Sequence, residues 1–78
     1  MVEKRSRLGQ RIRMERRCAG LTQQQLGERI GLTSCHAQRI GQWESGYRVP
    51  DPARLEQIER ALSLTEGTLA ALREPYQS

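Results

Sequence analysis

Residues 20–50 read GLTQQQLGERIGLTSCHAQRIGQWESGYRVP and contain two short periodic segments separated by a turn. Thr22 precedes the first segment and is followed three residues later by Gln25. This spacing predicts a capping box, in which each side chain accepts from a backbone N–H group that is left free at a helix start. Leu26 then begins an apolar stripe with a period of four residues. We therefore expect a helix over about residues 23–30.

The second segment carries Ile40 and Trp43, which are three residues apart and share one helix face. Gly46 follows, and a glycine that adopts a positive φ is a common way for a helix to end. These features predict a helix over about residues 37–45 whose opposite face is polar.

Together with positions in the flanking segments, this stretch resembles the phage-repressor and Cro-like helix-turn-helix family of XRE-type regulators. The resemblance covers about residues 8–72. It implies an all-α, compact, five-helix lambda-repressor-like DNA-binding domain, with the helix-turn-helix at helices two and three, about residues 22–46. The residues that carry it are Arg16, Gly20, Leu21, Thr22, Gln23, Leu26, Gly27, Gly31, Ile40, Trp43, Glu44, Gly46 and Pro50.

The sequence departs from the family pattern in the turn between the two helices. About three extra residues stand between Gly31 and Ile40, so the turn with residues 33–36 must be longer and the pattern does not fix the start of the second helix. Glu15 occupies a position that is usually apolar in the family, and Gly27 replaces the usual Ala at a cost in helix propensity of up to about 1 kcal/mol.

Three further helices are expected outside this stretch. Residues 1–5 have no packing pattern and are expected to be flexible, and Ser6 is a candidate N-cap for a first helix that ends near Cys18 or Ala19. Asp51 and Pro52 are typical of the start of a fourth helix.

The fourth helix shows a regular apolar stripe of Leu55, Ile58 and Leu62, which places Glu59 among its exposed residues. Thr65 is the candidate cap of a fifth helix over about residues 66–73.

Composition and charge fit one small domain of 78 residues with a formal net charge of +4. Residues 1–20 hold seven basic and two acidic side chains, whereas residues 51–78 hold three basic and five acidic ones. The basic N-terminal part is therefore expected to face a polyanion. No apolar run approaches the length of a membrane span and no secretory signal is visible, so we expect a cytoplasmic protein without a membrane partner.

The polar face of the second helix of the motif supplies the candidate base contacts. Gln38 and Gln42 present a donor and an acceptor that match adenine in the major groove, and Arg39 matches guanine or a phosphate. Gly41, between these two glutamines, removes a side chain and is expected to let the helix approach the bases. Within the family, positions that match Gln38 and Gln42 commonly contact bases.

Candidate contacts to the DNA backbone flank that face. Gln23 lies at a helix N-terminus that favours an anion, and it either contacts a phosphate or braces the following helix. The resemblance places Ser45, Tyr47 and Arg48 along the sugar-phosphate backbone, although Tyr47 is equally compatible with covering the edge of the core. The resemblance also implies a structural ion pair between Arg16 and Glu44.

No catalytic, metal or cofactor site is expected. The two cysteines, Cys18 and Cys35, lack metal-ligand spacing, and we expect them to be buried or half-exposed thiols. His36 has no partners for a zinc site or a catalytic triad. No small-molecule ligand is expected, and an enzyme is the least favoured class.

Two functional hypotheses remain open at this stage. The first is a sequence-specific transcriptional regulator, such as a Cro-like repressor or controller, that binds a palindromic operator in double-stranded DNA as a homodimer, with Leu69, Leu72 and Tyr76 as a candidate interface. The alternative is a protein-interaction module, such as an antitoxin, whose main task is to bind a protein partner.

Overall fold

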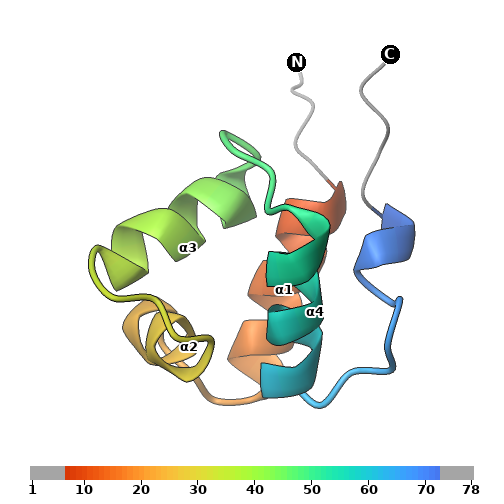
Figure 1. Cartoon of the computed structure of the whole chain (residues 1–78), viewed down its shortest axis with the longest axis horizontal. Helices are drawn as coiled ribbons and strands as arrows, with labels where there is room; N and C mark the ends of the chain where they lie inside the picture. Colours follow the sequence, from red (N-terminus) through yellow and green to blue (C-terminus); the bar gives the residue numbers. More distant parts are fainter. Residues whose placement is uncertain (1–6, 73–78) are drawn as a thin grey trace.

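The computed structural model describes residues 7–72, and these residues are all-helical, with no strand among them. In chain order the elements are α1 (Arg7–Cys18), α2 (Gln23–Arg29), α3 (His36–Ser45), α4 (Pro52–Ala61) and the short 3-10 helix η1 (Ala70–Leu72). Figure 1 shows α2 and α3 together on one side of the molecule, with η1 on the other. The predictions for residues 1–5, Ser6, Arg73 and Tyr76 fall outside the described residues.

The predicted start of α2 is confirmed. The backbone N–H of Gln25 donates to Thr22 Oγ1 at 3.0 Å, and the backbone N–H of Thr22 donates to Gln25 Oε1 at 2.9 Å. Both bonds of the capping box are therefore present, and α2 ends at Arg29, one residue before the predicted end.

The longer turn before α3 is held by a buried leucine and by the only histidine of the chain. Leu32 is buried in the core, and its backbone N–H donates to the carbonyl of Gly27 at 3.0 Å. His36 Nε2 donates to the carbonyl of Leu32 at 2.8 Å. Cys35, the residue before the helix, has a left-handed φ of 53°, so α3 begins at His36, one residue earlier than predicted.

Small residues let the helices of the motif approach one another closely. A Cβ at Gly27 would lie 2.6 Å from the Cβ of His36, which is closer than real side chains pack. The glycine therefore permits the contact between α2 and the start of α3.

The predicted end of α3 is confirmed, because Gly46 adopts a φ of 87° there.

The core lies where α1, the helix-turn-helix and α4 meet. It consists of apolar residues from all four α-helices, from the turn before α3 and from the C-terminal segment: Leu8, Ile12, Leu26, Ile30, Leu32, Ile40, Trp43, Leu55, Ile58, Leu62 and Leu69. The predicted cap of α4 is also confirmed, since the backbone N–H of Arg54 donates to Asp51 Oδ1 at 2.8 Å and Pro52 is the first residue of the helix.

The prediction of a fifth α-helix over residues 66–73 is wrong for the part that the structure describes. Residues 66–69 form turns, and only Ala70–Leu72 is helical, as a 3-10 turn. Gly67 has a φ of 93°, which interrupts a helix soon after the expected cap at Thr65. The segment nevertheless contributes Leu69 to the core, and this full burial removes Leu69 from the candidate dimer interface.

The expectation that Glu59 is exposed is also wrong. Its side chain is buried, and its carboxylate accepts backbone N–H groups of the C-terminal segment from Gly67 at 3.0 Å, Leu69 at 2.8 Å and Ala70 at 3.2 Å. One carboxylate therefore satisfies three backbone donors of a segment that does not form a continuous helix. Within residues 7–72, no helix combines the length and apolar character that a bilayer span requires.

Candidate functional site

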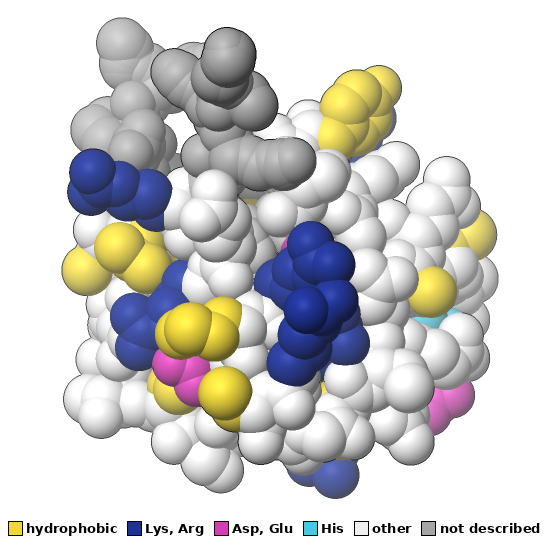
Figure 2. All heavy atoms as spheres, turned by 180° about the vertical axis from the view of Figure 1, so that it is seen from behind, with side chains coloured by type: hydrophobic (Ala, Val, Ile, Leu, Met, Phe, Trp, Pro, Cys, Tyr) yellow, Lys and Arg dark blue, Asp and Glu magenta, His cyan; other side chains and the backbone are white. Residues whose placement is uncertain are grey.

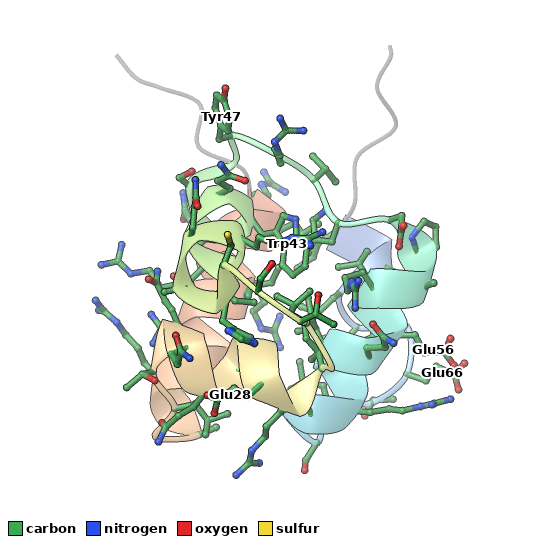
Figure 3. All side chains as sticks on the ribbon, turned by 60° about the vertical axis from the view of Figure 1, so that its left-hand side comes forward. Glu28, Trp43, Tyr47, Glu56 and Glu66 are labelled. Atoms are coloured by element: carbon green, nitrogen blue, oxygen red, sulfur yellow. The ribbon has the colours of Figure 1, made fainter. Side chains whose placement is uncertain are left out.

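The outward face of α3 carries the side chains that were predicted to contact bases. Gln38 and Arg39 are exposed and Gln42 is half-buried, whereas Ile40, Trp43 and Glu44 are buried. Figure 3 shows the Trp43 side chain directed from α3 into the body of the molecule. Because one face of α3 is fixed in the core, the opposite face is presented to solvent in a defined orientation.

A buried ion pair orients α3 relative to α1. Arg16 Nε donates to Glu44 Oε2 at 2.5 Å, and Nη2 donates to Oε1 at 3.3 Å. Arg16 Nη1 also donates to the carbonyl of Leu21 at 2.7 Å, in the turn before α2. The ion pair expected from the family pattern is therefore present, and it also joins the α1–α2 turn to α3.

Gln23 belongs to the same network. Its Nε2 donates to Glu44 Oε1 at 3.1 Å, so in this structure the side chain braces α3 rather than extending into solvent. A Cβ at Gly41 would lie 3.4 Å from Gln23 Nε2. Gly41 therefore lies beside the Gln23 amide with room for an added Cβ at van der Waals distance, and its role in letting α3 approach bases stays a prediction.

The loop after α3 exposes an aromatic and a basic side chain. Tyr47 is 74% exposed, which excludes the alternative that it covers the core edge, and Figure 3 shows it pointing away from the molecule. The guanidinium carbon of Arg48 lies 5.7 Å from the centre of the Tyr47 ring, a cation-π geometry. Ser45 supports the loop, because its Oγ donates to the carbonyl of Gln42 at 3.2 Å and accepts the backbone N–H of Tyr47 at 3.3 Å.

A shallow depression of about 590 Å³ runs between α1 and the ends of α2 and α3. We refer to it as the α1–α3 depression. Figure 2 shows arginine side chains gathered near the centre of one face of the molecule. The lining includes Gln10, Arg13 and Arg17 from α1, together with Gln23, Gly41 and Ser45.

Arg13 and Arg17 were not singled out as site residues by the sequence. Both belong to the basic residues of the N-terminal part, and a run of charged residues on a helix usually forms a solvated face. The signal that marks them is their spacing of four residues without a carboxylate of matching spacing in α1, since the one glutamate of that helix, Glu15, pairs with Arg11 at 2.8 Å.

The cysteines and the histidine do not form a ligand cluster. Cys18 and Cys35 are both free and exposed, which corrects the expectation of buried or half-exposed thiols. The second ring nitrogen of His36, Nδ1, lies 3.5 Å from Gln24 Nε2, so both ring nitrogens have protein neighbours. Across residues 7–72, no three His, Cys, Asp or Glu side chains come together in a way that would hold a metal ion.

Comparison with known proteins agrees with this architecture. The model of a family described as "Helix-turn-helix" matches residues 12–69, which include α2, α3 and the whole of α4. The chain belongs to the XRE/Cro-like helix-turn-helix family.

A curated protein is similar over most of the chain. An "uncharacterized HTH-type transcriptional regulator y4wC" from Sinorhizobium fredii (strain NBRC 101917 / NGR234) is 36% identical over 76 residues, covering 91% of this chain and 51% of that protein. The chain thus spans about half the length of this relative. No solved structure gives a significant match.

Proposed function

We propose that this chain is a sequence-specific double-stranded DNA-binding module of a transcriptional regulator, with α3 as the helix that enters the major groove. The observation that carries the proposal is the division of α3 into a buried face with Ile40 and Trp43 and a solvent face with Gln38, Arg39 and Gln42. A helix fixed in this way matches the width of the major groove and presents amide and guanidinium groups to base edges.

The roles of the individual residues follow from their positions. Gln38 and Gln42 are the proposed adenine contacts, and Arg39 contacts guanine or a nearby phosphate. Ser45, Tyr47 and Arg48 are the proposed backbone contacts on one side of α3, because Ser45 is exposed at the end of the helix and Tyr47 and Arg48 are exposed in the loop that follows it. Gln23 is proposed to contact a phosphate through its amide while it holds Glu44.

We further propose that the protein acts as a homodimer on a palindromic operator, as a Cro-like repressor or controller. A single recognition helix contacts only part of one turn of the duplex, whereas two copies placed about 34 Å apart contact successive major grooves. Family membership and the similar regulator from Sinorhizobium fredii support the general role in transcription.

The test is selection of binding sites from a random duplex library at about 150 mM salt, where non-specific affinity is weak and base contacts persist. We expect an inverted repeat to be recovered. A single unrepeated site would contradict the homodimer. Recovery of no consensus would contradict sequence-specific binding and favour a module that binds a protein partner.

A further inference from the structure

Three of the five arginines of α1 have no carboxylate partner among residues 7–72. Arg11 pairs with Glu15 and Arg16 pairs with Glu44. Arg7, Arg13 and Arg17 make no ion pair or side-chain hydrogen bond within the described residues and are exposed. Within the described part of the chain, no paired carboxylate therefore neutralises their positive charges.

Two of these three arginines line the α1–α3 depression. Arg13 and Arg17 are four residues apart, so they lie on the same face of α1, where like charges repel one another. The lining contains one carboxylate, that of Glu44, and Arg16 already neutralises it. The depression therefore has two uncompensated positive charges on its α1 side.

The opposite side of the depression is continuous with the proposed DNA-binding face. It includes Ser45 at the end of α3 and Gln23 at the start of α2. Figure 3 shows Glu56 and Glu66 at the edge of the molecule that lies away from α3, so these carboxylates do not oppose an anion in the depression.

We propose that Arg13 and Arg17 bind neighbouring phosphates of one DNA strand, namely the strand that borders the major groove occupied by α3. The inference rests on the proposed function and adds a phosphate-binding site on α1. Residues four apart are separated by about 6 Å along a helix, which lets each guanidinium contact a different phosphate of a strand that rises about 3.4 Å per nucleotide along the duplex axis. Contacts of this kind increase affinity for every sequence and add to its salt dependence, but they carry no sequence information.

The experiment compares the wild-type chain with Arg13→Gln/Arg17→Gln on a duplex that contains the selected site and on an unrelated duplex. Removal of two phosphate contacts should make the slope of log K against log salt shallower by about 1.8 units. The affinity advantage of the wild type should therefore shrink about twelvefold between 50 and 200 mM salt. We expect the same change on both duplexes and an unchanged preference between them.

The matched control is Arg29→Gln/Arg60→Gln, which removes the same amount of charge from a surface depression that shares no residue with the first. We expect this control to change the slope by much less. An equal change in the control, or no change in the Arg13→Gln/Arg17→Gln variant, would overturn the proposal, because net charge alone or no contact at all would then explain the data.

Failure of this inference is distinguishable from failure of the proposed function. Lack of any preference by the wild type for the selected duplex counts against the proposed function. Normal preference together with an unaltered slope in the arginine variant counts against the phosphate site alone. If the double variant does not fold, the single variants Arg13→Gln and Arg17→Gln test the proposal instead. Each should produce about half of the change in the slope of log K against log salt.

Discussion

Arg16 and Glu44 are 28 residues apart in sequence and form a two-point buried ion pair near the C-terminal ends of α1 and α3. Arg16→Ala leaves the Glu44 carboxylate buried and uncompensated, so it should lower the free energy of unfolding by about 3–5 kcal/mol. Urea denaturation followed by circular dichroism measures this loss.

The control for this variant is Arg60→Ala, which removes an exposed ion pair with Glu56 whose side chains are 75% and 45% exposed. Its effect should stay within about 1 kcal/mol. Similar losses in the two variants would mean that burial does not determine the contribution of the Arg16–Glu44 pair.

Glu59 gives the protein a specific dependence on pH. Burial raises the pKa of its carboxyl, but hydrogen bonds from the backbone N–H groups of Gly67, Leu69 and Ala70 outweigh that effect and hold the pKa below the ordinary value of 4.5. The pKa of Glu59 is therefore lower in the folded chain than in the unfolded chain. The ionised carboxylate stabilises the fold above about pH 4.5, and this stabilisation is lost as the pH falls through the folded-state pKa.

Glu59→Gln should therefore lower the free energy of unfolding by about 1–3 kcal/mol at neutral pH, because an amide NH₂ replaces one of the accepting oxygens. The difference in free energy of unfolding between wild type and variant should become smaller in denaturation experiments at about pH 3. If this difference were the same at neutral pH and at about pH 3, the charge of Glu59 would contribute nothing to stability.

Gly27→Ala should destabilise the fold by about 1–3 kcal/mol although alanine favours helix, since the added Cβ would overlap the Cβ of His36. Thermal unfolding followed by circular dichroism checks this. Gly41→Ala is the control, because its nearest neighbour is the flexible end of Gln23, at 3.4 Å. Equal stability of the Gly27→Ala variant and the wild type would contradict the close approach of α2 and α3.

Gln42→Ala should weaken binding to the preferred duplex by about 1–3 kcal/mol and relax selectivity at one base pair. Competition titrations with single-base variants of the site measure both effects. Gln57→Ala, at an exposed position of α4, is the control. Unchanged site preference in Gln38→Ala/Gln42→Ala would refute the assignment of α3 as the helix that contacts bases.

Arg48→Ala should weaken binding to all sequences alike and make the salt dependence shallower by about one unit, because a phosphate contact carries charge but no base information. Binding isotherms at several salt concentrations on preferred and unrelated duplexes check this. A loss confined to the preferred duplex would instead place Arg48 against a base.

Local chemistry explains why much of the helix-turn-helix was predictable. The caps at Thr22 and Asp51 and the glycine that ends α3 depend on residues within a few positions of one another, and all lie where the sequence predicted them. The Arg16–Glu44 pair was expected only through the family resemblance, because no local pattern connects residues so far apart.

The errors arise where contacts with other segments override local patterns. The period of α4 placed Glu59 with the solvent-facing residues, but the chain returns over that position and supplies three backbone donors. The apparent cap at Thr65 predicted a helix that the positive φ of Gly67 prevents. The base and phosphate contacts stay predictions, since side-chain exposure does not identify a ligand.

The bonds from Arg16 and Gln23 to Glu44 lie entirely within the chain. Since they join α1, α2 and α3 to one another, we expect the proposed docking on the exposed face of α3 to require no ordering of the backbone there. The entropy lost on binding then comes mainly from rotamers of surface side chains such as Gln38 and Arg39, at about 0.5–1.5 kcal/mol for each side chain that is immobilised.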